Sequence, residues 1–153
     1  MSIPTNHEVY SKEYIQNILQ STKTIALVGA SANPTRPSYG VMKFLMDNGY
    51  VVIPVNPGLS GQVLLGQKVY ATLADIPTTI DLIDIFRNSD SVQVIVEEAV
   101  SLPVLPKTIW MQLGVRNDAA AKMAEDHGVQ VVMNRCPAIE LENRNFIKTR
   151  SAQ

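Results

Sequence analysis

Apolar residues recur along the chain in short runs separated by segments with helical spacing. Five mostly apolar runs are typical of strands buried on both faces of a sheet, at 24–28, 50–55, 81–86, 108–113 and 129–133. The spacing within 81–86 also fits a helix, and only its context favours a strand. This alternation predicts a layer of parallel strands covered by helices.

Helices are predicted at the start of the chain and after the first, third and fourth apolar runs. Their boundaries are residues that commonly begin or end helices: Pro37 and Ser38, Gly49, Ser89, Asn117 and Gly128. The first twenty residues predict an added helix whose apolar face carries the i,i+4 pairs Tyr14 with Ile18 and Ile15 with Leu19. Residues 56–77 predict mostly loop, with one helical turn near 72–75.

The order of these elements predicts an α/β fold. Crossovers between parallel strands are right-handed, which leaves a doubly wound arrangement. We predict a single domain with a five-stranded, parallel, Rossmann-like sheet, in a strand order such as 3-2-1-4-5. The winding then reverses between the first and fourth strands, and ligands bind beyond the carboxyl ends of strands at such a reversal. The loop after the first strand is therefore the leading candidate for a site.

Composition narrows the class of protein. The chain has 153 residues, of which 46% are hydrophobic, enough for one ordinary core. A formal charge of -1 argues against binding to nucleic acid or to an anionic membrane. Charged residues make up only 18%, which is compatible with a homo-oligomer. One cysteine excludes an internal disulfide framework. No secretory signal or membrane-length apolar run is visible, so we predict a soluble, cytoplasmic protein.

The loop from Gly29 to Ser38 combines features of an anion site. It has a glycine where a ligand can approach the backbone, one cation and the amino end of a helix. Free backbone N–H groups and the helix dipole favour a negative charge there. The guanidinium of Arg36 is suited to phosphate. The residues of the loop alone fit equally well an ordinary turn in which Arg36 points to solvent.

Signatures of other nucleotide sites are missing. The nicotinamide dinucleotide fingerprint G-x-G-x-x-G degrades here to a single glycine, Gly29. Asn56 stands at the end of the second strand, where that fingerprint requires an acidic residue for the ribose. No G-K-[ST] sequence occurs, so a P-loop is excluded. These absences disfavour dehydrogenases and P-loop nucleotidases.

Six blocks of sequence together resemble the small stand-alone CoA-binding domain proteins, relatives of the nucleotide-binding domain of succinyl-CoA synthetase alpha subunits. The blocks are VGASANPTRPSYGVMKFL, IPVNP, YATLADIP, DLIDIFRNS, IWMQLGVRN and VVMNRCPAIE. They occur in order between Lys23 and Glu140, and the combination of GAS-x-x-P-x-RPS, VNP, FR and RCP is specific. The resemblance implies a CoA-binding domain at 21–142, a helical extension at 1–20 and a tail at 143–153.

The resemblance also implies that coenzyme A lies across the carboxyl edge of the sheet. Gly29, Ala30 and Ser31 would meet the pyrophosphate, with Pro34, Arg36 and Ser38 nearby. Asn56 and Pro57 would flank the adenosine, and Phe86 and Arg87 would cover the ligand from the other side. Gln112 and Gly114 would line the exit of the pantetheine, and Arg135 and Cys136 stand at the same edge.

The sequence departs from the family pattern at a few positions. Gly40 replaces a larger residue, and residues 101–107 lack a usual glycine turn; both changes should leave binding intact. Asn134 replaces an acidic residue, which puts in doubt an acid role at that position. Cys136 has two interpretations. Beside Arg135 it could be a thiolate and form a mixed disulfide with the thiol end of CoA under oxidising conditions, or it could be buried and inert.

Other chemical candidates are weak. Asp81 and Asp84 would face opposite sides of a strand and cannot form a catalytic pair, although one could bond a neighbouring loop. His7 and His127 have no visible metal partner. We therefore predict non-catalytic binding of CoA or acyl-CoA, as a sensor or carrier module. A nicotinamide- or other nucleotide-binding oxidoreductase or transferase component is the alternative, and a structural interaction domain with an empty cleft is a third.

Overall fold

The computed structural model describes residues 5–143 and contains a five-stranded parallel sheet. Its strands are β1 (Thr24–Val28), β2 (Val51–Val55), β5 (Leu82–Ile85), β6 (Thr108–Met111) and β7 (Gln130–Val132). The helices are α1 (Lys12–Ser21), α2 (Pro37–Asp47), α3 (Val92–Val100), α4 (Asp118–Asp126) and α5 (Pro137–Asn143). The α/β fold class is confirmed. The predicted tail at 143–153 lies outside the described residues beyond Asn143, and so does the start of the predicted extension.

The order of the strands is β2-β1-β5-β6-β7. The predicted order 3-2-1-4-5 is therefore wrong, because the third core strand, β5, pairs with β1 and not with β2. The winding reverses between β1 and β5, one strand earlier along the chain than predicted. The reversal brings the loop after β1 directly beside the residues that follow β5.

Pro54 explains why β2 lies at the edge of the core sheet. A proline has no backbone N–H and is found in edge strands, since it interrupts a ladder in the middle of a sheet. On its outer side β2 carries only a short bridge: Tyr70 N donates to Pro54 O at 3.1 Å, and Asn56 N donates to Tyr70 O at 2.9 Å. A central position for β2, as the predicted order required, would have left one ladder bond unmade.

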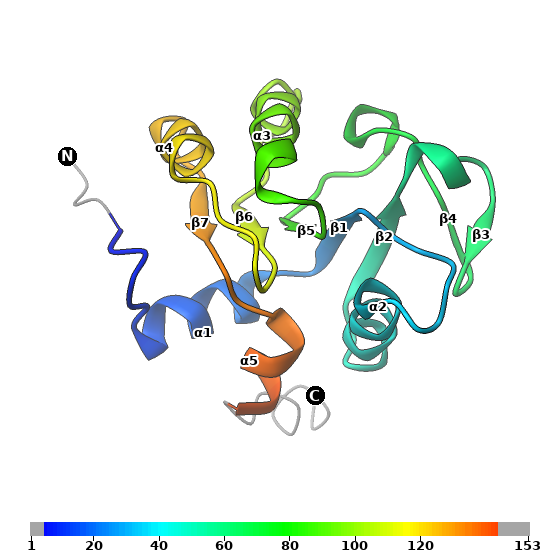
Figure 1. Cartoon of the computed structure of the whole chain (residues 1–153), viewed down its shortest axis with the longest axis horizontal. Helices are drawn as coiled ribbons and strands as arrows, with labels where there is room; N and C mark the ends of the chain where they lie inside the picture. Colours follow the sequence, from blue (N-terminus) through cyan, green and yellow to red (C-terminus); the bar gives the residue numbers. More distant parts are fainter. Residues whose placement is uncertain (1–4, 144–153) are drawn as a thin grey trace.

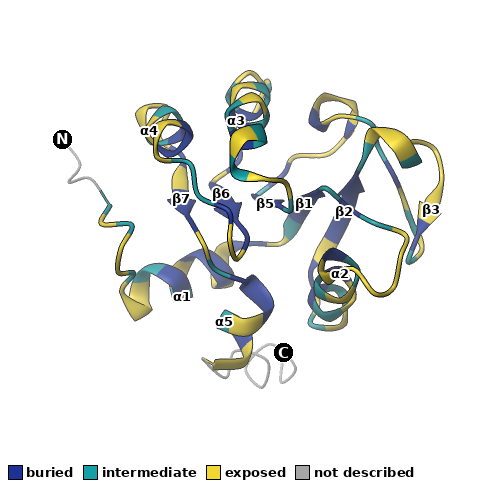
Figure 2. Ribbon diagram, in the orientation of Figure 1, coloured by how far each residue is buried: buried dark blue, intermediate teal, exposed yellow. Residues whose placement is uncertain are grey.

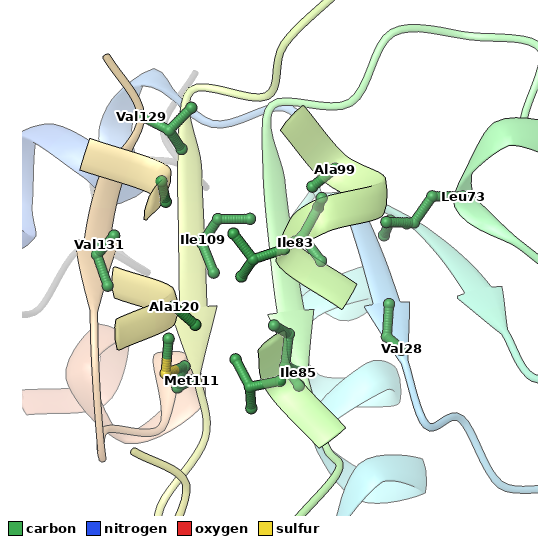
Figure 3. Close-up of a cluster of buried hydrophobic side chains, with 14 of the residues drawn as sticks. Val28, Leu73, Ile83, Ile85, Ala99, Ile109, Met111, Ala120, Val129 and Val131 are labelled. Carbon is green, nitrogen blue, oxygen red and sulfur yellow. The ribbon is translucent and has the colours of Figure 1, made fainter. Parts of the chain in front are cut away.

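Helices cover both faces of the sheet (Figure 1), with α3 and α4 on one side and α1, α2 and α5 on the other. Figure 3 shows the first core, in which Ile83, Ile85, Ile109 and Met111 of the central strands pack beneath small residues of α3 and α4. The second core includes Leu27, Leu82 and Trp110. Figure 2 shows the strands almost wholly buried, as expected for a parallel sheet covered on both faces.

Several local predictions require correction. The predicted strand ends shorten by one or two residues at 50–55, 81–86, 108–113 and 129–133. The loop at 56–77 contains a hairpin of β3 (Val63–Leu64) and β4 (Gln67–Lys68) and two 3-10 turns, at Pro57–Leu59 and Leu73–Asp75. Asn88 caps a further 3-10 turn, Ser89–Ser91, that leads into α3, so Ser89 is not the cap. Helix α5 was not predicted, because its 7 residues are too few for a clear period.

The N-terminal segment protects the outer edge of β7. The Tyr14 hydroxyl donates to Val131 O at 2.8 Å and accepts from Val131 N at 3.2 Å, and the Tyr10 hydroxyl accepts from Met133 N at 2.8 Å. Burial raises the pKa of Tyr10 to about 12, so its hydroxyl remains neutral and available for bonding at physiological pH. Two phenol groups thus satisfy backbone groups that an exposed edge would offer to another chain.

We expect Tyr14→Phe to lower the free energy of unfolding by about 1–3 kcal/mol, because the amide and carbonyl of Val131 lose their partner. Urea unfolding followed by circular dichroism measures the change. Tyr70→Phe is the control, since it keeps the ring that Lys68 Nζ contacts at 5.3 Å from the centroid. An equal stability for wild type and Tyr14→Phe would mean that the phenol does not support the edge.

Candidate functional site

A cleft opens at the carboxyl ends of β1, β2 and β5, where the winding of the sheet reverses. Its volume is about 380 Å³. Nine of the predicted site residues line it: Gly29, Ala30, Ser31, Arg36, Ser38, Asn56, Pro57, Phe86 and Arg87. Val28, Pro37 and Val55 line it as well and were not predicted. Each of these three adjoins a predicted residue in the sequence, and this adjacency is the only signal that could have identified them.

Gly29 allows β1 and β5 to approach each other at the floor of the cleft. Its φ is +90°, a conformation that favours glycine. A Cβ atom there would overlap the carbonyl oxygen of Phe86 and lie 2.9 Å from its carbonyl carbon. Gly29 N and Ala30 N both donate to Val55 O, at 3.0 and 3.3 Å. The first turn of the loop is thereby held against both neighbouring strands.

The rest of the loop folds around Asn33. Asn33 Oδ1 accepts from Thr35 N at 3.0 Å and from Thr35 Oγ1 at 2.8 Å, and Asn33 N donates to Ser31 Oγ at 3.1 Å. Arg36 N then donates to Asn33 O at 3.0 Å, and Arg36 is the N-cap residue of α2. Pro37 follows at the first helical position, where its fixed φ suits a helix start. The predicted helix start is confirmed.

Asn56 joins the loops that follow β1 and β2. Its Nδ2 donates to Ala30 O at 2.7 Å, and its Oδ1 accepts from Gly58 N at 2.8 Å. Both ends of the amide are therefore engaged in holding the walls of the cleft. A further contact of Asn56 with an adenosine stays a prediction.

The cleft carries positive charge only. Arg36 and Arg87 are exposed at its rim, and its lining residues include no aspartate or glutamate. Within residues 5–143, neither guanidinium lies in an ion pair. The amino end of α2 adds backbone N–H groups that have no partner within the helix. Two unpaired arginines and a helix amino end are suited to a ligand with several negative charges.

The remaining predicted residues lie outside the lining of this cleft: Pro34, Gln112, Gly114, Arg135 and Cys136. Gly114 N donates to Asn134 Oδ1 at 2.7 Å, and Arg135 lies over the ring of Tyr10, with its Cζ 5.3 Å from the centroid. Cys136 is 5% exposed, which fits the buried interpretation better than the reactive one. Contacts of these five residues with a ligand, and reaction of Cys136, stay predictions.

The two aspartates of the predicted strand at 81–86 have different surroundings, and only Asp84 lies within β5. Asp81 Oδ2 accepts from Lys23 N at 2.9 Å and from Thr24 N at 3.0 Å, so the predicted bond to a neighbouring loop is confirmed. Asp84 is fully buried, and burial raises the pKa of its carboxyl well above the usual value. Among the residues that the structure describes, no group of three or more His, Cys, Asp or Glu could hold a metal ion.

Comparison with known families fits this geometry. A family model described as a CoA-binding domain matches residues 23–142, which include every residue of the cleft. The chain belongs to this CoA-binding domain family. The resemblance that the sequence blocks indicated is confirmed. The helix α1 precedes the matched region, yet Ile15, Ile18 and Leu19 of α1 are buried in the second core.

This CoA-binding domain protein is similar to several known proteins. It is 37% identical over 126 residues to the uncharacterized protein YneT of Bacillus subtilis, covering 82% of this chain and 90% of that protein. A solved structure of a hypothetical protein from Pyrococcus horikoshii has a TM-score of 0.83 and 37% identity, covering 94% of this chain and 98% of that one.

A larger relative is the alpha subunit of ADP-forming acetate–CoA ligase I of Pyrococcus furiosus. It is 33% identical over 84 residues, which make up 52% of this chain but only 18% of the subunit.

In the described part of the CoA-binding domain protein, no helix is both long enough and apolar enough to span a bilayer.

Proposed function

We propose that this CoA-binding domain protein binds coenzyme A or an acyl-CoA at the cleft and does so without chemistry of its own. The observation that carries the proposal is the pair of unpaired arginines, Arg36 and Arg87, beside the amino end of α2. The phosphate groups of CoA supply the negative charges that such a cleft needs. Family membership supports CoA over other polyanions.

The roles of the residues follow from their positions. The turn at Gly29 would lie beside the pyrophosphate, and the missing side chain lets this turn pack against the Phe86 carbonyl at the floor of the cleft. Arg36 and Arg87 lie at the rim and would each pair with a phosphate. Asn56 links the loops after β1 and β2 through Ala30 O and braces its own loop by accepting from Gly58 N. The cleft is therefore built before the ligand arrives.

The nicotinamide alternative has less support. Dinucleotide sites use a carboxylate at the end of the second strand to bond the ribose hydroxyls. Asn56 takes that place here, and both ends of its amide are already bonded within the protein. We therefore expect CoA to bind more tightly than NAD or NADP.

A binding role without catalysis is favoured by the lining of the cleft. The lining residues include no histidine, cysteine, lysine, aspartate or glutamate that could act as a general acid or base. Ser31 and Ser38 have no such partner among them to activate a hydroxyl. A cytoplasmic sensor or carrier of CoA is the role that we infer, with a component of a larger enzyme as the second candidate because of the ligase subunit.

A thermal shift and calorimetric comparison of CoA, NAD, NADP and ATP tests the proposed function. A ligand that binds only the native state raises stability with its concentration, so a rise that saturates for CoA and is absent for NAD is expected. A larger rise with NAD or ATP than with CoA would contradict the proposal. Turnover of acyl-CoA by the purified protein would contradict the absence of chemistry.

We expect Arg36→Ala to weaken CoA binding by about 1.5–3 kcal/mol, the loss of one charge-assisted hydrogen bond to phosphate. Arg87→Ala should have a similar effect, and isothermal titration calorimetry measures both. Lys43→Ala is the matched control, since Lys43 lies on the same helix but pairs with Asp47 at 3.1 Å on the surface. An affinity that falls equally in the control would indicate net charge and not contact with the ligand.

A further inference from the structure

Two neighbouring residues in the second core carry polar atoms with no partner. Within residues 5–143, the buried side-chain oxygens or nitrogens that lack a hydrogen bond are Asp84 Oδ1, Asp84 Oδ2 and Gln112 Oε1. Asp84 is 0% exposed and Gln112 is 7% exposed. Buried polar groups in folded proteins are nearly always bonded, so each exception needs an explanation. Because the two residues are neighbours, one explanation should account for both.

The two side chains lie on the same face of the sheet. Asp84 alternates with Ile83 and Ile85 of the first core, so it faces the second core together with its register partners Leu27 and Trp110. Gln112 follows Trp110 by two residues, and its N donates to Ile85 O at 3.2 Å, which continues the ladder between β5 and β6. The two residues are therefore diagonal neighbours on one face of adjacent parallel strands.

The surroundings of Asp84 select its neutral form. Burial alone raises its pKa, with no charged neighbour contributing. On the helices that cover this face, Lys12 and Glu13 of α1 and Glu142 of α5 are exposed, and Lys43 and Asp47 of α2 pair with each other at the surface. The titratable groups on the buried or half-buried side are Tyr10, Tyr14, Tyr39, Tyr50, Cys136 and Glu140.

A neutral carboxyl complements the Gln112 amide. An ionised aspartate can only accept hydrogen bonds, whereas the protonated acid has one O–H to donate. The oxygen of Gln112 needs a donor, and neither this oxygen nor the Asp84 carboxyl has a hydrogen-bond partner. One buried water molecule commonly bridges such a pair, because it bonds two to four polar groups that would otherwise be unsatisfied.

Gln112 also lies next to the cleft. It directly follows β6, whose Met111 pairs with Ile85, so Gln112 stands opposite Phe86 on the neighbouring strand. Phe86 lines the cleft. A long ligand that leaves the cleft across Phe86 meets Gln112 next along the carboxyl edge. The pantetheine arm of CoA has amide groups along its length, and an oriented glutamine amide can both donate to and accept from them.

We propose that Asp84 is a positioning residue that orients the Gln112 amide through one water molecule for contact with the pantetheine arm. This inference rests on the proposed function, because it needs CoA in the cleft. It predicts that Asp84 influences the arm of the ligand and leaves the nucleotide end alone. Asp84 itself does not touch the ligand.

The test compares CoA with 3′-phosphoadenosine 5′-phosphate, which lacks the pantetheine arm, by calorimetry on the full chain. We expect Asp84→Leu and Gln112→Leu each to weaken CoA binding about tenfold, the effect of one lost hydrogen bond. The double variant should lose no more than either single variant, since the two residues act as one unit. Affinity for the truncated nucleotide should stay within about twofold in all variants, a difference below the usual limit of additivity.

Two further measurements distinguish a positioning role of Asp84 from a role in packing alone: rescue of CoA affinity by a conservative variant, and infrared spectroscopy. Asp84→Asn keeps a neutral donor and should restore most of the CoA affinity, whereas Asp84→Leu should not. The infrared difference spectrum of wild type against Asp84→Asn should contain the carbonyl stretch of a protonated carboxylic acid at neutral pH.

Three results would overturn the inference. The first is an equal loss of affinity for CoA and for the truncated nucleotide. The second is a loss of CoA affinity in the double variant that equals the sum of the two single losses. The third is an infrared spectrum in which Asp84 is an ionised carboxylate. A wild-type protein that binds neither ligand would instead contradict the proposed function. If circular dichroism shows that Asp84→Leu fails to fold, the infrared spectrum of wild type against Gln112→Leu decides, since loss of the amide should shift the acid carbonyl band.

Discussion

Gly29→Ala is expected to destabilise the fold by about 3 kcal/mol or more, the sum of strain at a positive φ and of overpacking. The new methyl group would overlap the carbonyl oxygen of Phe86, which belongs to the backbone and cannot turn aside. Relief requires that β1 and β5 separate at their carboxyl ends, where the cleft lies. We therefore expect CoA affinity to fall together with stability, as measured by urea unfolding and calorimetry.

Gly128→Ala is the matched control for this prediction. Gly128 has a φ of +82°, close to that of Gly29, but a Cβ there meets nothing within 4 Å. Its cost should therefore be the conformational strain alone, about 1 kcal/mol. Gly40→Ala, in α2 and also in open space, should be neutral or slightly stabilising. If the Gly29 and Gly128 variants lose equal stability, the close approach to Phe86 is not the reason for the glycine.

The second large effect concerns the pH dependence of the free energy of unfolding. Asp84→Asn should remove the part of this dependence that Asp84 causes. The pKa of Asp84 is raised in the folded protein, so the folded state holds a proton that the unfolded chain releases above its ordinary value of 3.8. The protonated Asp84 carboxyl contributes its full stabilisation at pH values below this ordinary pKa. The contribution declines as the pH rises toward the pKa of Asp84 in the folded protein. Wild type should therefore lose up to about 1.4 kcal/mol per pH unit over this window relative to Asp84→Asn.

Urea unfolding between about pH 5 and about pH 8 measures this difference, and the slope is what decides. The control is Asp47→Asn, which removes a carboxylate whose side chain is 63% exposed on α2. That variant should follow the wild-type profile closely, because exposed ion pairs contribute little to stability. Parallel profiles for wild type and Asp84→Asn would mean that Asp84 ionises with an ordinary pKa in the folded protein.

The pattern of apolar runs predicted the class of fold because burial on both faces demands apolar residues throughout a strand. TIALV at 24–28 coincides with β1 as observed. The order of the strands did not follow from these runs, since each could pair with several others at similar cost. Pro54 was a usable signal, because a proline in the second strand indicates an edge, and it argues against an order in which that strand is central.

The loop after β1 was identified from the expected reversal of the winding together with its own residues, and the blocks FR and VNP were associated with it through the family resemblance. Local chemistry is readable in this way because a glycine turn, an arginine and a helix start lie within ten positions, at 29–38. Which of the other predicted residues line the same cleft depended on the sheet. Phe86 and Arg87 do so because β5 pairs with β1. Gln112 and Cys136 lie outside it because they follow β6 and β7.

The sequence by itself determined the layers, the first strand and the helix start that follows the loop at 29–38, since these depend on residues close together in the chain. Tertiary structure alone decided that the carbonyl of Phe86 rests against Gly29, that both ends of the Asn56 amide are bonded, and that Asp84 shares a face with Gln112. The physical reason is that the pairing of strands is a choice among nearly equal alternatives. It is settled by long-range packing, and a single change of neighbour alters every contact at the carboxyl edge.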